Sequence, residues 1–287
     1  FGVDLFFVLS GYVISLTAAT KPATFLQDRL TRIFPGYLFW ALAWLVLASI
    51  EVPLDGWTAF TTLTLIPAPQ SLPTASYVVV GWTLTFELLF YLAMWLVLRG
   101  VRARWLLCLY GFAAALAIVI KTPWLEFLGS PMVAEFLLGV LAFKIGQRSR
   151  IVGALAMAMG IAGWMFMPHG LGADAFDPTL ARLRLIGWGP AALLLVWGAS
   201  QFRGSVAALR PLALLGDASY SIYLSNLLLF LTWEKLTGRF DHPLAGVVLA
   251  IALGLAAYLV VERPLLRAAR RLGRPRLPRP QAILQAP

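Results

Sequence analysis

The sequence predicts an all-α membrane protein, a polytopic helical bundle with about nine transmembrane helices. Composition gives the first indication, because 60% of the 287 residues are hydrophobic and 13% are charged. A soluble domain carries about 45–50% apolar and about 25% charged residues instead. The second indication is that the apolar residues gather in long runs, and about 20 helical residues cross the roughly 30 Å hydrocarbon core of a bilayer.

Nine apolar runs account for the predicted transmembrane helices. The stretch 57–66 is also apolar, but it is short and lies between Pro53 and Pro67. We therefore expect it to be an interfacial or re-entrant piece that does not span the membrane. The nine helices are expected at 3–19, 34–50, 78–98, 105–121, 131–146, 151–167, 185–200, 217–236 and 244–261.

The chain divides into a membrane domain over residues 1–264 and a cytoplasmic tail over residues 265–287. The tail alternates arginines with prolines, a composition typical of a disordered segment that binds the anionic headgroups of membrane lipid. It contains no aromatic residue and no nucleic-acid-binding module. We therefore expect membrane lipid, and no nucleic acid, as its partner.

The distribution of basic residues predicts the orientation in the membrane. In an alternating nine-helix arrangement, 18 of the 23 Lys and Arg residues fall on one side. The positive-inside rule makes that side cytoplasmic. We therefore expect the C-terminus to lie in the cytoplasm. The basic residues of this side lie in 20–33, 99–104, 144–150, 201–210 and 262–287.

Few side chains could bind a metal ion or form a disulfide. The two histidines, His169 and His242, lie in separate predicted external loops, and no metal-ligand cluster is found. We therefore expect no metal. The single cysteine, Cys108, has no partner for an internal disulfide, and we interpret it as a small core residue of an apolar helix.

The first candidate for chemistry is Glu87, a carboxylate inside the apolar run 78–98. An acid at the middle of a bilayer costs roughly 2.5–3.5 kcal/mol on insertion scales, so it needs a partner or a water-filled cavity. On a helix, Thr83, Glu87 and Tyr91 lie four residues apart and form one polar stripe, flanked by Trp82. Glu87 is then either a buried acid fixed for packing or an acid in the wall of a cavity.

The second candidate is the pair Arg29 and Arg32 in the first cytoplasmic segment. If this segment is helical, a spacing of three residues puts both guanidinium groups on one face. Arginine binds phosphate oxygens with two parallel hydrogen bonds, which suits a cytosolic cofactor with a diphosphate. The alternative is ordinary positive charge at the cytoplasmic surface.

Two further segments carry polar residues at membrane depth. In the first run, Asp4 is expected near the outer interface, and Ser10 and Gly11 are small enough for close helix packing or a slender ligand. The segment 217–226 is so polar that it must face protein or water, as interhelical contacts or as a substrate path. Its two polar sides are Asp217, Ser221 and Ser225, and Ser219, Tyr223 and Asn226.

Together these motifs resemble the acyltransferase-3 family of integral membrane acyltransferases, which includes bacterial O-antigen and exopolysaccharide O-acetylases. Any one motif is weak, but the set runs in order through nearly the whole chain. The matching segments are GVDLFFVLSGYVIS at 2–15, RLTRIFPGY at 29–37, WTLTFELLFY at 82–91, DASYSIYL at 217–224 and VERP at 261–264.

The resemblance implies a ten-helix fold and the transfer of an acyl group, commonly acetyl, from cytosolic acyl-CoA. The implied acceptor is a hydroxyl of a carbohydrate or lipid-linked glycan, often on the outer side. The implied location is the bacterial cytoplasmic (inner) membrane. The implied donor site comprises Arg29 and Arg32, which would contact the CoA phosphates, with Ser10, Gly11 and Trp82. Glu87, Tyr223 and Asn226 are the implied catalytic residues, with Glu87 in the wall of a central cavity.

The sequence departs from the family pattern in two places. The family carries the histidine assigned to catalysis on a first helix upstream of FFVLSG, whereas Phe1 already lies in that apolar run. Transfer to an alcohol needs a base, and histidine suits this role. We therefore expect a truncated start, with the base on the missing helix and no turnover by the 287-residue chain. Asn226 stands where many members have histidine, and it cannot act as a base.

Two other functions remain open from the residues alone. Polar stripes and a buried acid would equally serve a transporter or flippase for a glycolipid or polyol. A helical scaffold that has lost catalysis is the third interpretation. Dependence on acyl-CoA would distinguish the enzyme, because a transporter has no reason to bind that donor.

Overall fold

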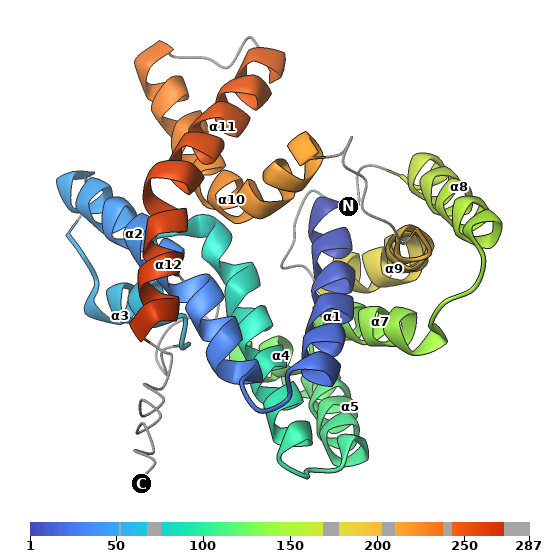
Figure 1. Cartoon of the computed structure of the whole chain (residues 1–287). Coiled ribbons are helices and arrows are strands. Elements are labelled where there is room, and N and C mark those ends of the chain that lie inside the picture. Colours follow the sequence, from blue (N-terminus) through green and yellow to red (C-terminus); the bar gives the residue numbers. More distant parts are fainter. Residues whose placement is uncertain (52, 68–75, 169–177, 203–209, 238–242, 273–287) are drawn as a thin grey trace, which may run out of the picture.

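The computed structural model describes residues 1–51, 53–67, 76–168, 178–202, 210–237 and 243–272. All regular structure in these ranges is helical, which confirms the predicted fold class (Figure 1). The helices are α1 Gly2–Thr20, α2 Phe25–Glu51, α3 Gly56–Thr64, α4 Trp82–Leu98, α5 Ala103–Val119, α6 Pro123–Leu128, α7 Pro131–Ile145, α8 Arg150–Phe166, α9 Pro178–Ser200, α10 Arg210–Thr237, α11 Pro243–Ala257 and α12 Arg263–Leu272.

Each of the nine apolar runs falls on a helix of the described chain. Seven helical segments there are long and apolar enough to cross a membrane, and α5 and α8 are shorter apolar helices of 17 residues each. Cys108, expected in the core, is instead exposed on α5. The prediction placed the start of the second helix at residue 34, but α2 begins at Phe25. The segment with both candidate arginines is therefore part of that helix.

Two predicted segments differ in detail. The stretch 57–66 forms the short helix α3, in which the Asp55 carboxylate accepts a hydrogen bond from the Thr58 N–H at 2.7 Å. The Tyr37 hydroxyl of α2 donates to the Thr62 carbonyl of α3 at 2.6 Å, so α3 packs against α2. The tail expected to be disordered from residue 265 is still helical to the end of α12, while 273–287 lie outside the described residues.

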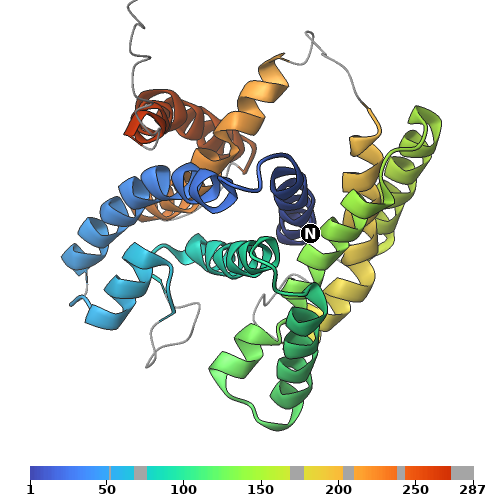
Figure 2. The ribbon, with the colours of Figure 1, turned by 60° about the horizontal axis from the view of Figure 1, so that its bottom comes forward.

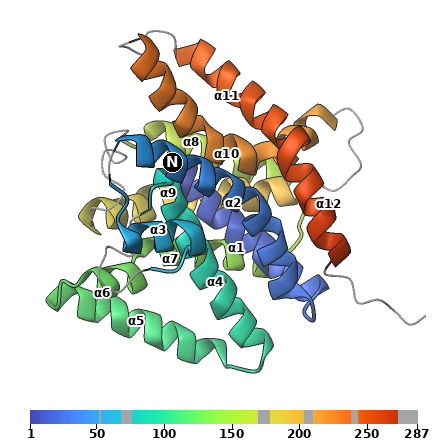
Figure 3. The same cartoon turned by 90° about the vertical axis from the view of Figure 1, so that its left-hand side faces the viewer.

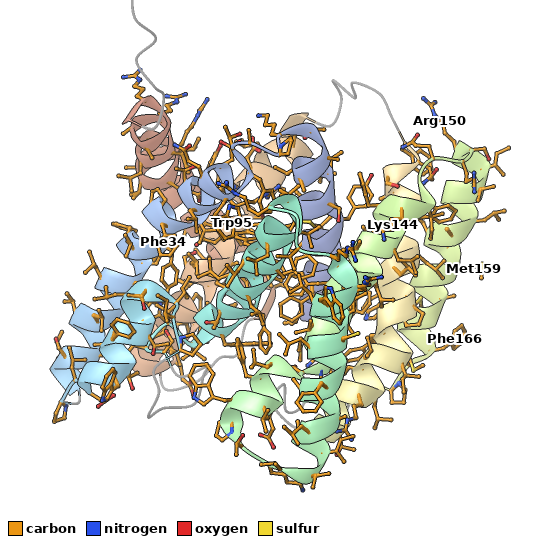
Figure 4. All side chains as sticks on the ribbon, turned by 90° about the horizontal axis from the view of Figure 1, so that it is seen from below. Phe34, Trp95, Lys144, Arg150, Met159 and Phe166 are labelled. Carbon is orange, nitrogen blue, oxygen red and sulfur yellow. The ribbon has the colours of Figure 1, made fainter. Side chains whose placement is uncertain are left out.

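Apolar and basic residues occupy different parts of helix α8. Phe166 and Met159 are exposed on the bundle surface, as expected for side chains that face lipid. Arg150 lies at the opposite end of α8 from Phe166 (Figure 4), and Lys144 lies in the last turn of the preceding helix, α7. Basic residues thus flank the turn between α7 and α8.

Helix α1 lies at the centre of the bundle, between α4 on one side and α7 and α9 on the other (Figure 2). Small residues let α1 and α7 approach closely. A Cβ atom on Gly139 would lie 2.1 Å from the Val8 carbonyl oxygen, and one on Gly11 would lie 2.1 Å from the Phe136 carbonyl oxygen. Backbone is in contact with backbone here, so both positions require glycine.

A buried ion pair joins α1 to α9. The Arg184 guanidinium donates from Nε and Nη2 to the two carboxylate oxygens of Asp4, each at 3.1 Å, and neither residue is exposed to solvent by more than 3%. Glu135 of α7 is also buried. The sequence placed Asp4 near the outer interface but gave no indication of its partner.

A third group of contacts assembles the other side of the bundle. Helix α12 packs along α2, and α10 packs against α11 (Figure 3). Between α11 and α12 the chain forms one π-helical turn, Tyr258–Glu262. This arrangement brings the C-terminal helices beside the segment of α2 that carries the arginines.

Replacing Gly139 by alanine is expected to force α1 and α7 apart, because the added methyl group meets backbone atoms. The loss of stability should be about 1–3 kcal/mol, the usual range for overpacking. Thermal unfolding of the detergent-purified protein measures it. Gly111→Ala in α5 is the matched control, since a methyl group there meets no atom within 4 Å. Equal melting of the two variants would contradict the close approach.

Replacing Arg184 by alanine should leave the Asp4 carboxylate buried without its guanidinium partner. Breaking such a pair costs roughly 3–5 kcal/mol, so we expect a large drop in unfolding temperature. Arg182→Ala removes the same charge from an exposed position of α9 and should change stability little. Asp4→Asn/Arg184→Ala should recover part of the loss; a double variant less stable than Arg184→Ala would argue against the pair.

Candidate functional site

A cavity of about 750 Å³ lies beside α1, with walls from α1, α2, α4, α9 and α10. Its volume is in the range of small-molecule sites, about 300–1,000 Å³. The cavity follows one face of α1. The lining residues are Phe1, Gly2, Val3, Phe6, Leu9, Ser10, Val13, Ile14, Arg29, Arg32, Ile33, Thr83, Leu84, Glu87, Tyr91, Arg184, Gly216, Ser219, Tyr220 and Tyr223.

One arginine side chain lies at each end of the cavity. Its lining residues on α1 run from Phe1 to Ile14, which corresponds to roughly 20 Å of helix at 1.5 Å per residue. Arg184, which pairs with Asp4, marks the end near the start of α1. Arg29 contacts the Val13 carbonyl and therefore marks the other end.

Arg29 is anchored to α1. Its Nη2 donates to the Val13 carbonyl oxygen at 3.2 Å and to the Thr17 hydroxyl. Its Nε is buried and has no hydrogen-bond partner. A buried donor without a partner is costly, and an anionic ligand oxygen in the cavity is one group that could satisfy it.

Arg32 is held by the C-terminal helices. Its Nη1 donates to Oε1 of Glu262 at 3.1 Å, and its Nη2 donates to the Asp217 carbonyl at 3.3 Å. The Arg32 side chain is 34% exposed, whereas the Glu262 side chain is 1% exposed. The predicted arginine pair is thus brought to one cavity mouth, with each guanidinium fixed by a different helix.

Glu87 lies in the wall of the cavity. This is one of the two positions that the sequence left open for it. It is 8% exposed, and the Tyr91 hydroxyl donates to its Oε1 at 2.6 Å. The predicted polar stripe Thr83, Glu87 and Tyr91 lines the cavity along its whole length on α4. Tyr91 also faces the Arg29 guanidinium, 6.0 Å from the ring centre.

Tyr223 closes the cavity from α10. Its hydroxyl donates to the Val80 carbonyl at 3.0 Å and is 2.9 Å from the Thr83 hydroxyl. Its ring stacks on Phe6 with centres 6.2 Å apart. Val80 belongs to the 3₁₀ turn Val79–Gly81, directly before α4, so this contact fixes the start of α4 to α10.

The remaining predicted site residues do not all reach the cavity. Ser10 lines it, but Gly11 lies at the crossing with α7. Trp82 packs its ring against Phe7 and Phe86. Asn226 is half-buried on α10 and is not among the lining residues. Both histidines, His169 and His242, lie outside the described residues.

Three residues of the site were not identified from the sequence. Arg184 of α9 is buried and paired with Asp4. Tyr220 lines the cavity and donates from its hydroxyl to the Ile33 carbonyl at 3.1 Å. Glu262 accepts from both Arg32 and Ser221. The signal for Glu262 was an acid directly after an apolar run, but its partners lie more than 40 residues away in sequence.

Known proteins resemble this chain over most of its length. A family model described as an acyltransferase domain, that of the acyltransferase-3 family, matches residues 1–262. The chain is also 32% identical over 298 aligned positions to the exopolysaccharide production protein ExoZ of Rhizobium meliloti (strain 1021), with 94% of this chain and 90% of that protein covered. No solved structure matches.

The matched range contains every residue that lines the cavity. The arginine pair, the cavity acid and the tyrosines of α10 therefore occur together within one family domain. The chain belongs to the acyltransferase-3 family and is an integral membrane acyltransferase.

Proposed function

We propose that the protein transfers an acyl group, acetyl being the expected one, from acyl-CoA to a hydroxyl of a carbohydrate. The observation that carries this proposal is a single cavity with Arg29 and Arg32 at one mouth and Glu87 in its wall. The relative named above is an exopolysaccharide production protein, which supports an exopolysaccharide or its lipid-linked precursor as the acceptor.

The donor fits the arginine mouth by charge. Acyl-CoA carries a diphosphate and a further phosphate, and two guanidinium groups can bind such oxygens with charge-assisted hydrogen bonds. Arg29 offers a buried Nε without a partner, and Arg32 is partly exposed. The basic residues of α7 and α8 support a cytoplasmic location of this mouth, since positive residues favour that side.

The proposed reaction joins the hydroxyl oxygen to the carbonyl carbon of the thioester. The carbon–sulfur bond then breaks, the CoA thiolate leaves, and the hydroxyl proton ends on the thiolate. We assign Glu87 to the handling of that proton, because it is a carboxylate in the cavity wall. Tyr91 fixes one oxygen of Glu87, which leaves the other oxygen for a partner in the cavity.

Acetyl-CoA should bind the detergent-purified chain, and Arg29→Ala/Arg32→Ala should weaken binding at least tenfold. Each lost charge-assisted hydrogen bond is worth about 1.5–3 kcal/mol, and tenfold corresponds to about 1.4 kcal/mol. Titration calorimetry measures the affinity. Arg99→Ala/Arg102→Ala is the matched control, because it removes two exposed arginines with the same spacing outside the cavity. Equal weakening in both double variants would contradict a specific site.

Glu87→Gln should lower acyl transfer by about 10²–10⁴-fold, the usual contribution of acid–base groups, with acetyl-CoA affinity changed little. Tyr91→Phe keeps the carboxylate and removes its hydrogen bond, so its loss should be smaller. Because the base is expected on the upstream helix, each variant is made in the chain extended by that helix. Transfer of radiolabelled acetyl groups to polysaccharide by membranes that carry each extended variant is the measurement. Wild-type rates in Glu87→Gln would remove Glu87 from the reaction.

A further inference from the structure

Glu262 contacts Arg32 but is not itself among the residues that line the cavity. It lies in the π-helical turn between α11 and α12, and such turns occur frequently at functional sites. Its Oε1 accepts from Arg32 at 3.1 Å, and its Oε2 accepts from the Ser221 hydroxyl at 2.5 Å. Both oxygens of this carboxylate are therefore engaged.

The surroundings of Glu262 keep it in this place. Gly36 of α2 faces it, and a Cβ atom there would lie 3.2 Å from Glu262 Cγ and 3.3 Å from the Tyr220 ring. The carboxylate is thus enclosed by α2, α10 and the π-helical turn. Burying a carboxylate is costly unless it is paired and hydrogen-bonded, and Arg32 is a basic side chain that contacts Glu262, whose side chain is 1% exposed.

The contact matters for Arg32 because a free arginine has many rotamers. Fixing such a side chain costs about 1.5–2 kcal/mol in conformational entropy, which weakens any ligand that must do so. In this structure Glu262 and the Asp217 carbonyl engage one N–H each from Nη1 and Nη2. Of the five N–H donors of a guanidinium, three remain for a ligand.

We propose that Glu262 is a positioning residue for the donor site, which holds the Arg32 guanidinium ready for a phosphate group. The proposal rests on the function proposed above, in which Arg29 and Arg32 bind acyl-CoA. Glu262 has a second, opposite effect, since its negative charge weakens the field that attracts an anion. The sign of the change on removing Glu262 therefore shows which effect is larger.

Glu262→Ala should weaken acetyl-CoA binding about fivefold. Without Glu262 the Arg32 side chain is free before binding, so the ligand must fix it and the conformational entropy of that side chain is lost on binding. Glu262→Gln should restore most of the affinity, since its amide oxygen can still accept from Arg32. Asp217→Asn is the control for charge alone. Asp217 is exposed, and its contact with Arg32 uses the backbone carbonyl, so this variant should bind acetyl-CoA as tightly as wild type or more tightly.

Calorimetry in the Arg32→Ala background completes the test, because there Glu262→Ala should have no further effect. Ser221→Ala frees one oxygen of Glu262 and should also weaken acetyl-CoA binding, to a smaller extent than Glu262→Ala. If Glu262→Ala does not fold, Ser221→Ala replaces it in the test. Unchanged or tighter binding by Glu262→Ala, or an equal effect without Arg32, would overturn the inference. Failure of wild type to bind acetyl-CoA would instead overturn the proposed function.

Discussion

Charged side chains inside an apolar bundle must find their partners within the protein, because the bilayer core contains no water to solvate them. This constraint determines how the helices of this acyltransferase meet. The Asp4–Arg184 pair fixes α1 to α9, and the Arg32–Glu262 pair fixes α2 to the turn before α12. The aromatic and small residues then fill the space that these pairs define.

The same constraint explains how a mostly apolar cavity can hold a carboxylate in its wall. Phe7 and Phe136 pack with ring centres 4.8 Å apart, and Phe90 stacks on Phe136 at 4.7 Å, behind the part of α4 that carries Glu87. An aromatic layer on one side and hydrogen-bonded tyrosines on the other keep the acid in place. A catalytic group needs this kind of support, since loosely held groups lose their geometry.

The sequence was sufficient for the helices and for part of the site. Hydropathy located nine apolar runs because each needs its own length of chain to cross a bilayer. Thr83, Glu87 and Tyr91 could be placed on one face because helical periodicity is local. Family membership decides between the enzyme and the transporter, which polar stripes alone left open.

The partners of Arg32 and Asp4 could not be predicted, because they lie 230 and 180 residues away in sequence. Gly11 and Ser10 are neighbours, yet one faces α7 and the other the cavity; their order along the chain does not reveal this division.

The contact between Arg29 and α1 has a thermodynamic consequence. The guanidinium that is proposed to meet the donor also donates to the Val13 carbonyl and the Thr17 hydroxyl, close to the end of the central helix. Any ligand that draws this group toward itself changes how strongly α1 is held against α2. By linkage, whatever tightens or loosens α1 must change the affinity for that ligand by the same factor. Substitutions along α1, far from the arginine mouth, can therefore tune donor affinity without touching the donor.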